Sequence, residues 1–152
     1  MGNDRQTPHN DEEAVSKVSF QGLYNIRSYQ DSDKNFILST FLKGLYYGNK
    51  YYGMIEKKIF MDNYKVVANA MLSNPNVVVK VACLPEDPTV ILGYSIVSRD
   101  YKRIIWTFVK TPWRNKGIGK SLLPSNPESY MHFTDIGLEL IKKFPNCIFN
   151  PF

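Results

Sequence analysis

The chain has 152 residues, which suits one compact domain, and 43% of them are hydrophobic, enough for a sizeable core. The formal net charge of +5 is typical of proteins that bind an anionic ligand or nucleic acid, although many ordinary proteins share it. No apolar run approaches the roughly 18 residues of a membrane span, and the start is polar, so we expect a soluble cytoplasmic protein with no membrane partner.

The two cysteines, Cys83 and Cys147, and the two histidines, His9 and His132, are scattered along the chain. None of them has the spacing of a metal-binding motif. We therefore expect buried free thiols in a reducing compartment and no metal site.

Residues 1–18 are polar, without a helical or strand period, and we expect a flexible tail followed by a single domain at 19–152. The spacing of apolar residues and turn formers then predicts strands and helices. In chain order we expect a strand at 20–29, a helix near 36–45, a tyrosine-rich loop at 46–53, a helix at 56–72, strands at 77–84, 89–98 and 103–110, a short helix stopped by Pro124, a strand at 130–134, a helix capped by Asp135 and a strand at 147–149. The tyrosine-rich loop either packs on the domain or forms a wall that faces a substrate.

Residues 104–123 run from an apolar strand through a turn with two glycines into a helix. Such a turn presents unpaired N–H groups to an anion, and glycine lets the backbone approach that anion closely. The basic residues Lys110, Arg114, Lys116 and Lys120 surround it, with no acid among residues 110–120. We interpret the stretch as a phosphate site; the alternative is a basic surface turn in which glycine serves only the bend.

The motif Arg114-Asn115-Lys116-Gly117-Ile118-Gly119 and the element order resemble the GNAT (GCN5-related N-acetyltransferase) superfamily. Its pyrophosphate signature is Arg/Gln-x-x-Gly-x-Gly/Ala after the fourth strand. The resemblance implies an α+β (α/β) fold of order β-α-α-β-β-β-α-β-α-β, with a mixed, mostly antiparallel central sheet flanked by helices. It also implies that acetyl-CoA (coenzyme A) binds where the fourth and fifth strands splay apart. The residues that would hold the cofactor are Phe108, Val109, Lys110, Arg114, Asn115, Lys116, Gly117, Ile118, Gly119, Lys120 and Ser121.

Many members of this family carry a Glu on the fourth strand as general base, yet residues 103–109 hold no carboxylate. They also carry an Asn at the end of the fifth strand and a Tyr beyond it, where this chain has Asp135 and Lys142. His132 is our first candidate for acid–base catalysis, since a neutral imidazole accepts a proton near pH 7. The alternative is that His132 is a packed or surface side chain.

Tyrosines are the lesser catalytic candidates. Their normal pKa near 10 suits an acid that protonates the leaving thiolate better than a base. We expect this role from Tyr130 or Tyr52, with Tyr47 and Tyr51 as further candidates.

The resemblance thus implies an N-acyltransferase that moves the acetyl group of acetyl-CoA to an amine by direct attack. The acceptor amine is unidentified, and monomer and homodimer both stay open. Residues 134–137 and 149–152 are similar to small GNAT-like proteins of phages and bacterial genomes, which implies a bacterial or phage-infected cell. A full GNAT fold usually has one more strand, so we expect either a minimal fold or a shortened chain.

Two other functions stay open. A nucleic-acid-modifying or nucleic-acid-binding GNAT-like protein of the Mom type is favoured by the positive charge and by the aromatic and basic residues 46–58. A catalytically silent GNAT-fold binding subunit is favoured by the missing fourth-strand Glu.

Overall fold

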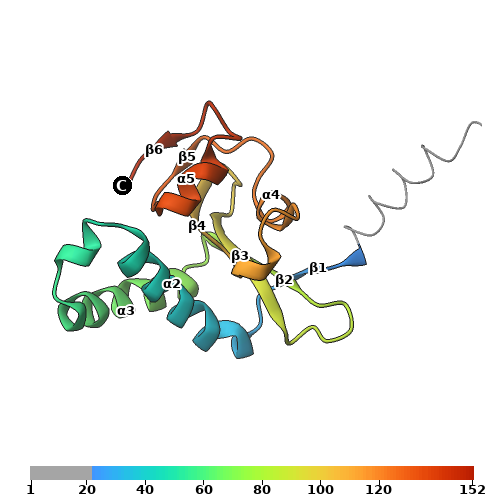
Figure 1. The fold of residues 1–152 in the computed structure, drawn as a ribbon, viewed down its shortest axis with the longest axis horizontal. Helices are drawn as coiled ribbons and strands as arrows, with labels where there is room; N and C mark the ends of the chain where they lie inside the picture. The colour runs from blue at the N-terminus through green and yellow to red at the C-terminus, as the bar shows by residue number, and fades with distance from the viewer. Residues whose placement is uncertain (1–21) are drawn as a thin grey trace, which may run out of the picture.

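The computed structural model of the protein describes residues 22–152, so the predicted tail at 1–18 lies outside the described residues. The helices and strands follow one another in the predicted order (Figure 1). They are β1 (Asn25–Ser28), α2 (Lys34–Gly48), α3 (Lys57–Ser73), β2 (Val77–Cys83), β3 (Ile91–Ser98), β4 (Arg103–Val109), α4 (Ile118–Leu122), β5 (Ser129–Tyr130), α5 (Asp135–Ile141) and β6 (Ile148–Phe149), with short 3₁₀ turns η2 (Asp31–Asp33), η3 (Tyr52–Met54) and η4 (Thr111–Trp113) between them.

One six-stranded sheet carries these strands side by side in sequence order. Neighbouring strands from β1 to β4 pair antiparallel, whereas β5 runs parallel to β4 and β6 runs parallel to β5. Helices α2 and α3 pack on one face of the sheet, and α4 and α5 lie on the other (Figure 1). The predicted fold class is confirmed: this is an α/β fold with a mixed, mostly antiparallel central sheet flanked by helices.

The pairing of β4 with β5 is short. It joins Arg103 to Ser129 and Ile104 to Tyr130, and Met131 N–H donates to the Ile104 carbonyl oxygen at 2.9 Å. Beyond this point the two strands separate. On its other side β4 also carries a β-bulge, since Ile96 pairs with Trp106 and Val97 with Ile104, which leaves Ile105 as the extra residue. The split and the bulge lie at the same height in the sheet.

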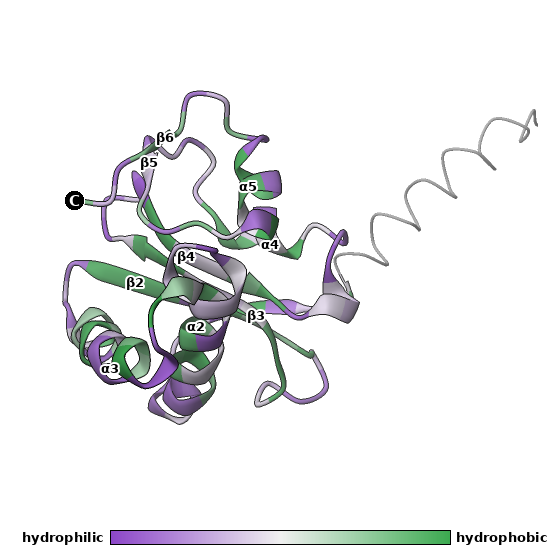
Figure 2. Ribbon diagram, turned by 60° about the vertical axis from the view of Figure 1, so that its left-hand side comes forward, coloured by the Kyte–Doolittle hydropathy of each residue, from purple (hydrophilic) through white to green (hydrophobic). Residues whose placement is uncertain are grey.

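The central strands β2, β3 and β4 are the most hydrophobic part of the sheet (Figure 2). Tyr94 of β3 is fully buried, and its hydroxyl donates to the Ile37 carbonyl oxygen at 3.1 Å while accepting from Trp106 Nε1 at 3.2 Å. This hydroxyl also lies 2.8 Å from Thr40 Oγ1. The network ties β3 and β4 to α2, so it fixes Trp106 at the point where the split begins.

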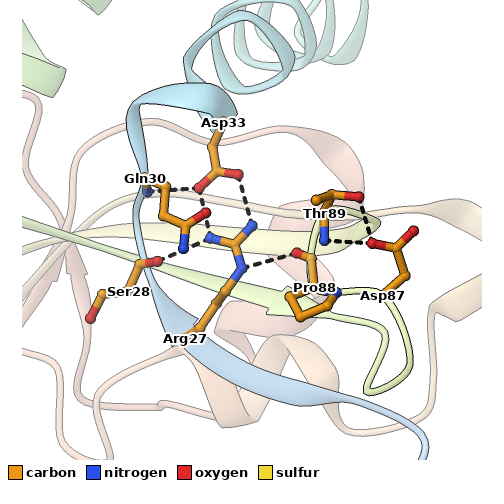
Figure 3. A network of polar contacts seen from close by, with 7 residues as sticks. All are labelled: Arg27, Ser28, Gln30, Asp33, Asp87, Pro88 and Thr89. Carbon is orange, nitrogen blue, oxygen red and sulfur yellow. Dashed lines mark hydrogen bonds and ion pairs between the residues drawn. The ribbon is translucent and has the colours of Figure 1, made fainter.

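A second polar network holds the start of α2 to the sheet (Figure 3). Arg27 of β1 donates two hydrogen bonds of 2.8 Å to the Asp33 carboxylate and one of 3.0 Å to the Pro88 carbonyl oxygen. Burial alone would raise the pKa of Asp33, but the hydrogen bonds from Arg27 and from the Gln30 amide outweigh it and lower the pKa. The network therefore joins β1, η2 and the β2–β3 turn.

Several predicted boundaries were wrong, each for a local reason. The tyrosine-rich loop was predicted at 46–53, yet α2 continues to Gly48, because Gly44 serves close packing on Trp106 rather than ending the helix. The strand predicted at 130–134 is limited to Ser129–Tyr130, because β5 leaves β4 there. Thr134, not Asp135, caps α5: its Oγ1 accepts from Gly137 N–H at 3.0 Å.

Candidate active site

A cavity of about 600 Å³ passes through the split between β4 and β5. On the α4 and α5 side it is lined by the glycine turn, by Val109 and by Leu140; on the α2 side it is lined by Gly44, Tyr47 and Trp106. Side chains alternate between the two faces of a strand, and Trp106 and Phe108 pack into the core beneath α2 and α3. The cavity therefore opens toward both faces of the sheet.

The glycine turn lies at one end of this cavity. Gly117 has a φ of +82°, in the left-handed region, and the space where its Cβ would be is open. Asn115 also has a positive φ, of 62°. A Cβ at Gly119 would come within 3.2 Å of Leu140, so glycine lets α4 approach α5 closely. The turn suits an anion through its exposed N–H groups, more than through a helix dipole, because α4 has only five residues.

Most of the predicted cofactor residues line the cavity, namely Phe108, Val109, Arg114, Asn115, Gly117, Ile118, Gly119 and Lys120. Three do not. Lys110 Nζ lies 5.1 Å from the centre of the Phe36 ring, Lys116 is outside the lining, and Ser121 donates to the Gly117 carbonyl oxygen at 2.9 Å. Ser121 also lies 2.7 Å from the Tyr24 hydroxyl. The hydroxyl of Ser121 thus supports the turn from behind.

The backbone of β4 presents its free polar groups to the split at alternate residues. Lys110 N–H donates to the Leu92 carbonyl oxygen of the β3 side at 2.8 Å. Since main-chain groups alternate along an antiparallel pair, those of Phe108 also face β3, and those of Thr107 and Val109 face the split. Phe108 and Val109 were predicted to hold the cofactor; the alternation shows that Thr107 and Val109 are the residues whose main-chain groups face the split. The Val109 carbonyl oxygen already accepts from Arg114 Nε at 3.0 Å.

His132 lies just past the end of β5 and lines the cavity on the α2 side. Its ring meets the Phe41 ring edge-on, with 5.7 Å between centroids. Nδ1 lies 3.1 Å from the Ile105 carbonyl oxygen, at the bulge of β4. Because a carbonyl oxygen only accepts, Nδ1 carries the proton and Nε2 of the neutral ring keeps its lone pair. Burial lowers the pKa of His132, and the charge of Arg103 lowers it further, against the opposing hydrogen bond to Ile105.

Two of the four tyrosine candidates line the cavity and two do not. Tyr130 lines the cavity where β4 and β5 join. Tyr47 lines it on the α2 side and is 66% exposed. Tyr52 lies outside the cavity, where its ring packs on Phe60 and Tyr64, and Tyr51 is exposed outside it as well.

Sequence reasoning missed Thr107 and most of α5. Oγ1 of Thr107 is shielded from solvent and has no hydrogen-bond partner among the described residues, yet the residue lines the cavity. A shielded polar atom without a partner calls for an explanation, and a ligand in the cavity supplies one. From α5 the lining takes Asp135, Glu139 and Leu140 among others. The only sequence signal for Thr107 was that a single Thr stands in an apolar strand. No sequence signal marked the α5 residues.

Among residues 22–152, no group of three or more His, Cys, Asp or Glu side chains is placed to hold a metal ion. Within the same range, no helix combines the length and the apolar character needed to cross a membrane.

No family model matches the sequence, and no curated protein sequence matches it significantly. In structure the chain is similar to a possible acetyltransferase from Clostridium difficile 630, with a TM-score of 0.48 and 13% identity over 84% of this chain and 79% of that chain. It is also similar to apo YjaB from Escherichia coli, with a TM-score of 0.48 and 11% identity over 81% of this chain and 67% of that one. A third similar structure is the PaiA N-acetyltransferase from Thermoplasma acidophilum, solved in complex with coenzyme A. Its TM-score is 0.43, with 14% identity over 65% of this chain and 66% of that chain. Likenesses this distant carry no activity over to this chain, whose chemistry must follow from its own residues.

Proposed function

We propose that this protein is a coenzyme A-dependent N-acyltransferase, which moves the acetyl group of acetyl-CoA, or a related acyl group, to an amine. The observation that carries the proposal is the cavity through the split sheet. It has a glycine turn suited to phosphate at one end and a neutral histidine farther along its wall. A donor and an acceptor can thus approach each other from opposite faces of the sheet and meet at the split.

The donor's pyrophosphate would lie at the turn from Arg114 to Lys120. The open space beside Gly117 lets an anion approach the backbone of the turn, and the side chains of Arg114 and Lys120 line the same end of the cavity. The pantetheine arm would then follow β4 into the split, paired with main-chain groups of Thr107 and with the Val109 N–H like an added strand. The main catalytic contribution of this arrangement would be to place the thioester carbon within reach of the amine.

His132 would act as the general base. An alkylamine is mostly protonated at neutral pH, so its nitrogen must lose protons before and during the attack on the thioester. The free Nε2 lone pair of the neutral His132 can take that proton, because Nδ1–H is held by the Ile105 carbonyl oxygen. Tyr130, which lines the cavity at the closed end of the split, is the candidate that returns a proton to the departing thiolate.

The proposal is tested by ligand-induced stabilisation followed by turnover. Coenzyme A and acetyl-CoA at saturating concentration should raise the melting temperature. A panel of primary amines, assayed by release of free thiol from acetyl-CoA, should then identify an acceptor. Absence of any thermal shift would refute cofactor binding; a shift without turnover on any amine would leave the catalytically silent binding subunit as the better description.

A nucleic acid acceptor is the second candidate, and one observation favours it. Tyr47 and Tyr51 are 66% and 61% exposed, and the Nζ atoms of Lys57 and Lys50 lie 5.3 and 5.2 Å from the centres of their respective rings. Exposed aromatic rings with lysines beside them suit base stacking and phosphate contacts. Fluorescence anisotropy with single-stranded oligonucleotides at low and moderate salt would test it. Binding that the Tyr47→Ala variant leaves unchanged would count against this surface.

A further inference from the structure

The cavity continues past His132, toward the closed end of the split. Four residues line that deeper part, and they come from β4, from the position just after α4, from β5 and from α5: Ile104, Leu123, Tyr130 and Ile141. Ile104 and Tyr130 are the pair at which β4 and β5 join. The hydrogen bond from Met131 N–H to the Ile104 carbonyl oxygen closes the split there.

The surroundings of this closed end are apolar. Ile104 and Leu123 belong to a buried cluster with Val97, Phe144 and Cys147, and Tyr130 and Ile141 pack against it. A polar or charged group placed there would lose its hydration without a partner, whereas a hydrocarbon chain would not.

The sequence explains why this end is hollow. Pro124 cannot continue a helix, so α4 ends at Leu122 and Leu123 adopts an extended backbone, with ψ of 155°. The wall beyond the glycine turn is therefore formed by the Leu123 side chain and by α5 instead of a further turn of α4.

We infer that the acyl group transferred by this protein is a short apolar chain longer than acetyl, such as butyryl, with its alkyl end at Ile104, Leu123 and Ile141. The inference rests on the proposed function, since the thioester must lie at the split for its acyl chain to reach this end. In the reaction the amine nitrogen forms a bond to the acyl carbon and the bond from that carbon to sulfur breaks. The amine proton passes to the base, and the thiolate leaves with a proton returned from acid or solvent.

Each methylene buried at the closed end should tighten binding by about fourfold, the ordinary gain from removing one CH₂ group from water. Butyryl-CoA, with two more methylenes, should therefore bind about fifteenfold more tightly than acetyl-CoA. Chains too long for the cavity should lose this gain. Free coenzyme A, which has no acyl chain, provides the reference affinity.

The experiment measures dissociation constants of the full chain for coenzyme A and for its acetyl, butyryl, hexanoyl and succinyl thioesters. We expect butyryl-CoA to bind more tightly than acetyl-CoA, and succinyl-CoA to gain nothing because its carboxylate would be buried. In the Ile141→Phe variant the preference for butyryl over acetyl should fall to about one while free coenzyme A still binds. The matched control is Ile148→Phe, at a residue that is 65% exposed and lies outside the cavity, and it should keep the preference.

Two results would overturn the inference, and they are distinguishable. If coenzyme A and acetyl-CoA bind but longer acyl chains bind no better or are rejected, the acyl chain does not occupy the closed end of the split. The proposed function then stands. If no coenzyme A compound binds at all, the proposed function fails and this inference fails with it.

Discussion

The imidazole of His132 is fixed to the bulge of β4, because its Nδ1–H donates to the Ile105 carbonyl oxygen across 3.1 Å. Ile105 is the extra residue of that bulge, so its carbonyl oxygen is available on the side away from β3. The bond determines which nitrogen of the ring carries the proton, and it leaves Nε2 unprotonated beside the cavity. A local irregularity of the strand thereby orients the imidazole.

Replacement of His132 by Asn should remove the base while keeping an amide that can donate to Ile105. We expect thiol release to fall by about 10²–10⁴-fold, the usual contribution of a positioned general base. The thermal shift produced by coenzyme A should persist, because the glycine turn is untouched. A variant that loses less than threefold in activity would exclude His132 as the base.

The pH dependence of the reaction rate should reflect the titration of His132. Burial lowers the pKa of His132 below its ordinary 6.5, so the ring is neutral and able to accept a proton at pH 7. The rate at low substrate concentration should fall only as the pH drops below about 6.5, with an apparent pKa beneath that of a free histidine. The fold should lose stability in the same direction, because the unfolded chain binds that proton more readily. An acidic limb centred above pH 7 would contradict this assignment.

Thr107 and Ser95 face each other across β3 and β4 and offer a matched pair of hydroxyl deletions. Thr107→Val removes a hydroxyl without a partner, so it should leave the melting temperature unchanged or raised, yet weaken acyl-CoA binding by about 0.5–1.5 kcal/mol if the ligand satisfies that hydroxyl. Ser95→Ala removes a buried hydroxyl that donates to the Leu122 carbonyl oxygen at 2.8 Å, so it should destabilise the fold by about 1–3 kcal/mol. Denaturant unfolding and ligand titration of both variants separate the two effects. Equal effects of the two on binding would argue against a ligand contact at Thr107.

Gly117→Ala tests the turn itself. An alanine at a φ of +82° should cost roughly 1–2 kcal/mol of backbone strain and move the N–H groups that face the cavity. Coenzyme A affinity should fall by more than the loss of folded protein explains. Gly53→Ala is the control, since its Cβ would make only an ordinary 3.6 Å contact away from the cavity. If both variants bind coenzyme A like the unaltered protein, the turn does not hold the pyrophosphate.

Asp33→Asn tests the network that anchors α2 (Figure 3). Arg27 would lose its ionic partner in a site where the Asp33 side chain is only 4% exposed, so we expect a loss of about 2–4 kcal/mol in the free energy of unfolding. Since the pKa of Asp33 is lowered, its contribution to stability is present above pH 4 and is lost as the pH falls through the lowered value. Urea unfolding at pH 7 and at pH 3 should show a smaller difference between variant and parent at the lower pH. A difference independent of pH would contradict the ion pair as its source.

Much of the fold could be predicted from the sequence because its periodicities are strong. The alternation in β3, the apolar stripe of α3 and the glycine turn before α4 each follow from local chemistry. The boundaries that failed depend on distant partners: α2 runs through Tyr46 and Tyr47 because its glycines pack on Trp106 and Thr134. β5 ends early because it parts from β4, which no local pattern reveals.

The site could be predicted in part for the same reason. The turn from Arg114 to Lys120 is local, so a sequence motif marks it, and most of its residues line the cavity. The hydrogen bond between His132 and Ile105 spans 27 residues and depends on a bulge, so no local pattern reveals it. Lys110 and Ser121, predicted to hold the cofactor, lie outside the cavity lining, since nearness in sequence does not reveal that one lies over Phe36 and the other bonds to Gly117. Tyr52, a predicted catalytic candidate, also lies outside the lining, because exposed and packed tyrosines in one segment look alike in sequence.

The most direct measurement is a crystal structure of the full chain with coenzyme A. We expect pyrophosphate oxygens within hydrogen-bond distance of the N–H groups between Arg114 and Gly119. We also expect a pantetheine arm along Thr107 and Val109 and a sulfur atom in the split near His132. Coenzyme A bound outside the split, or bound with its phosphates away from the glycine turn, would contradict the proposed cofactor site.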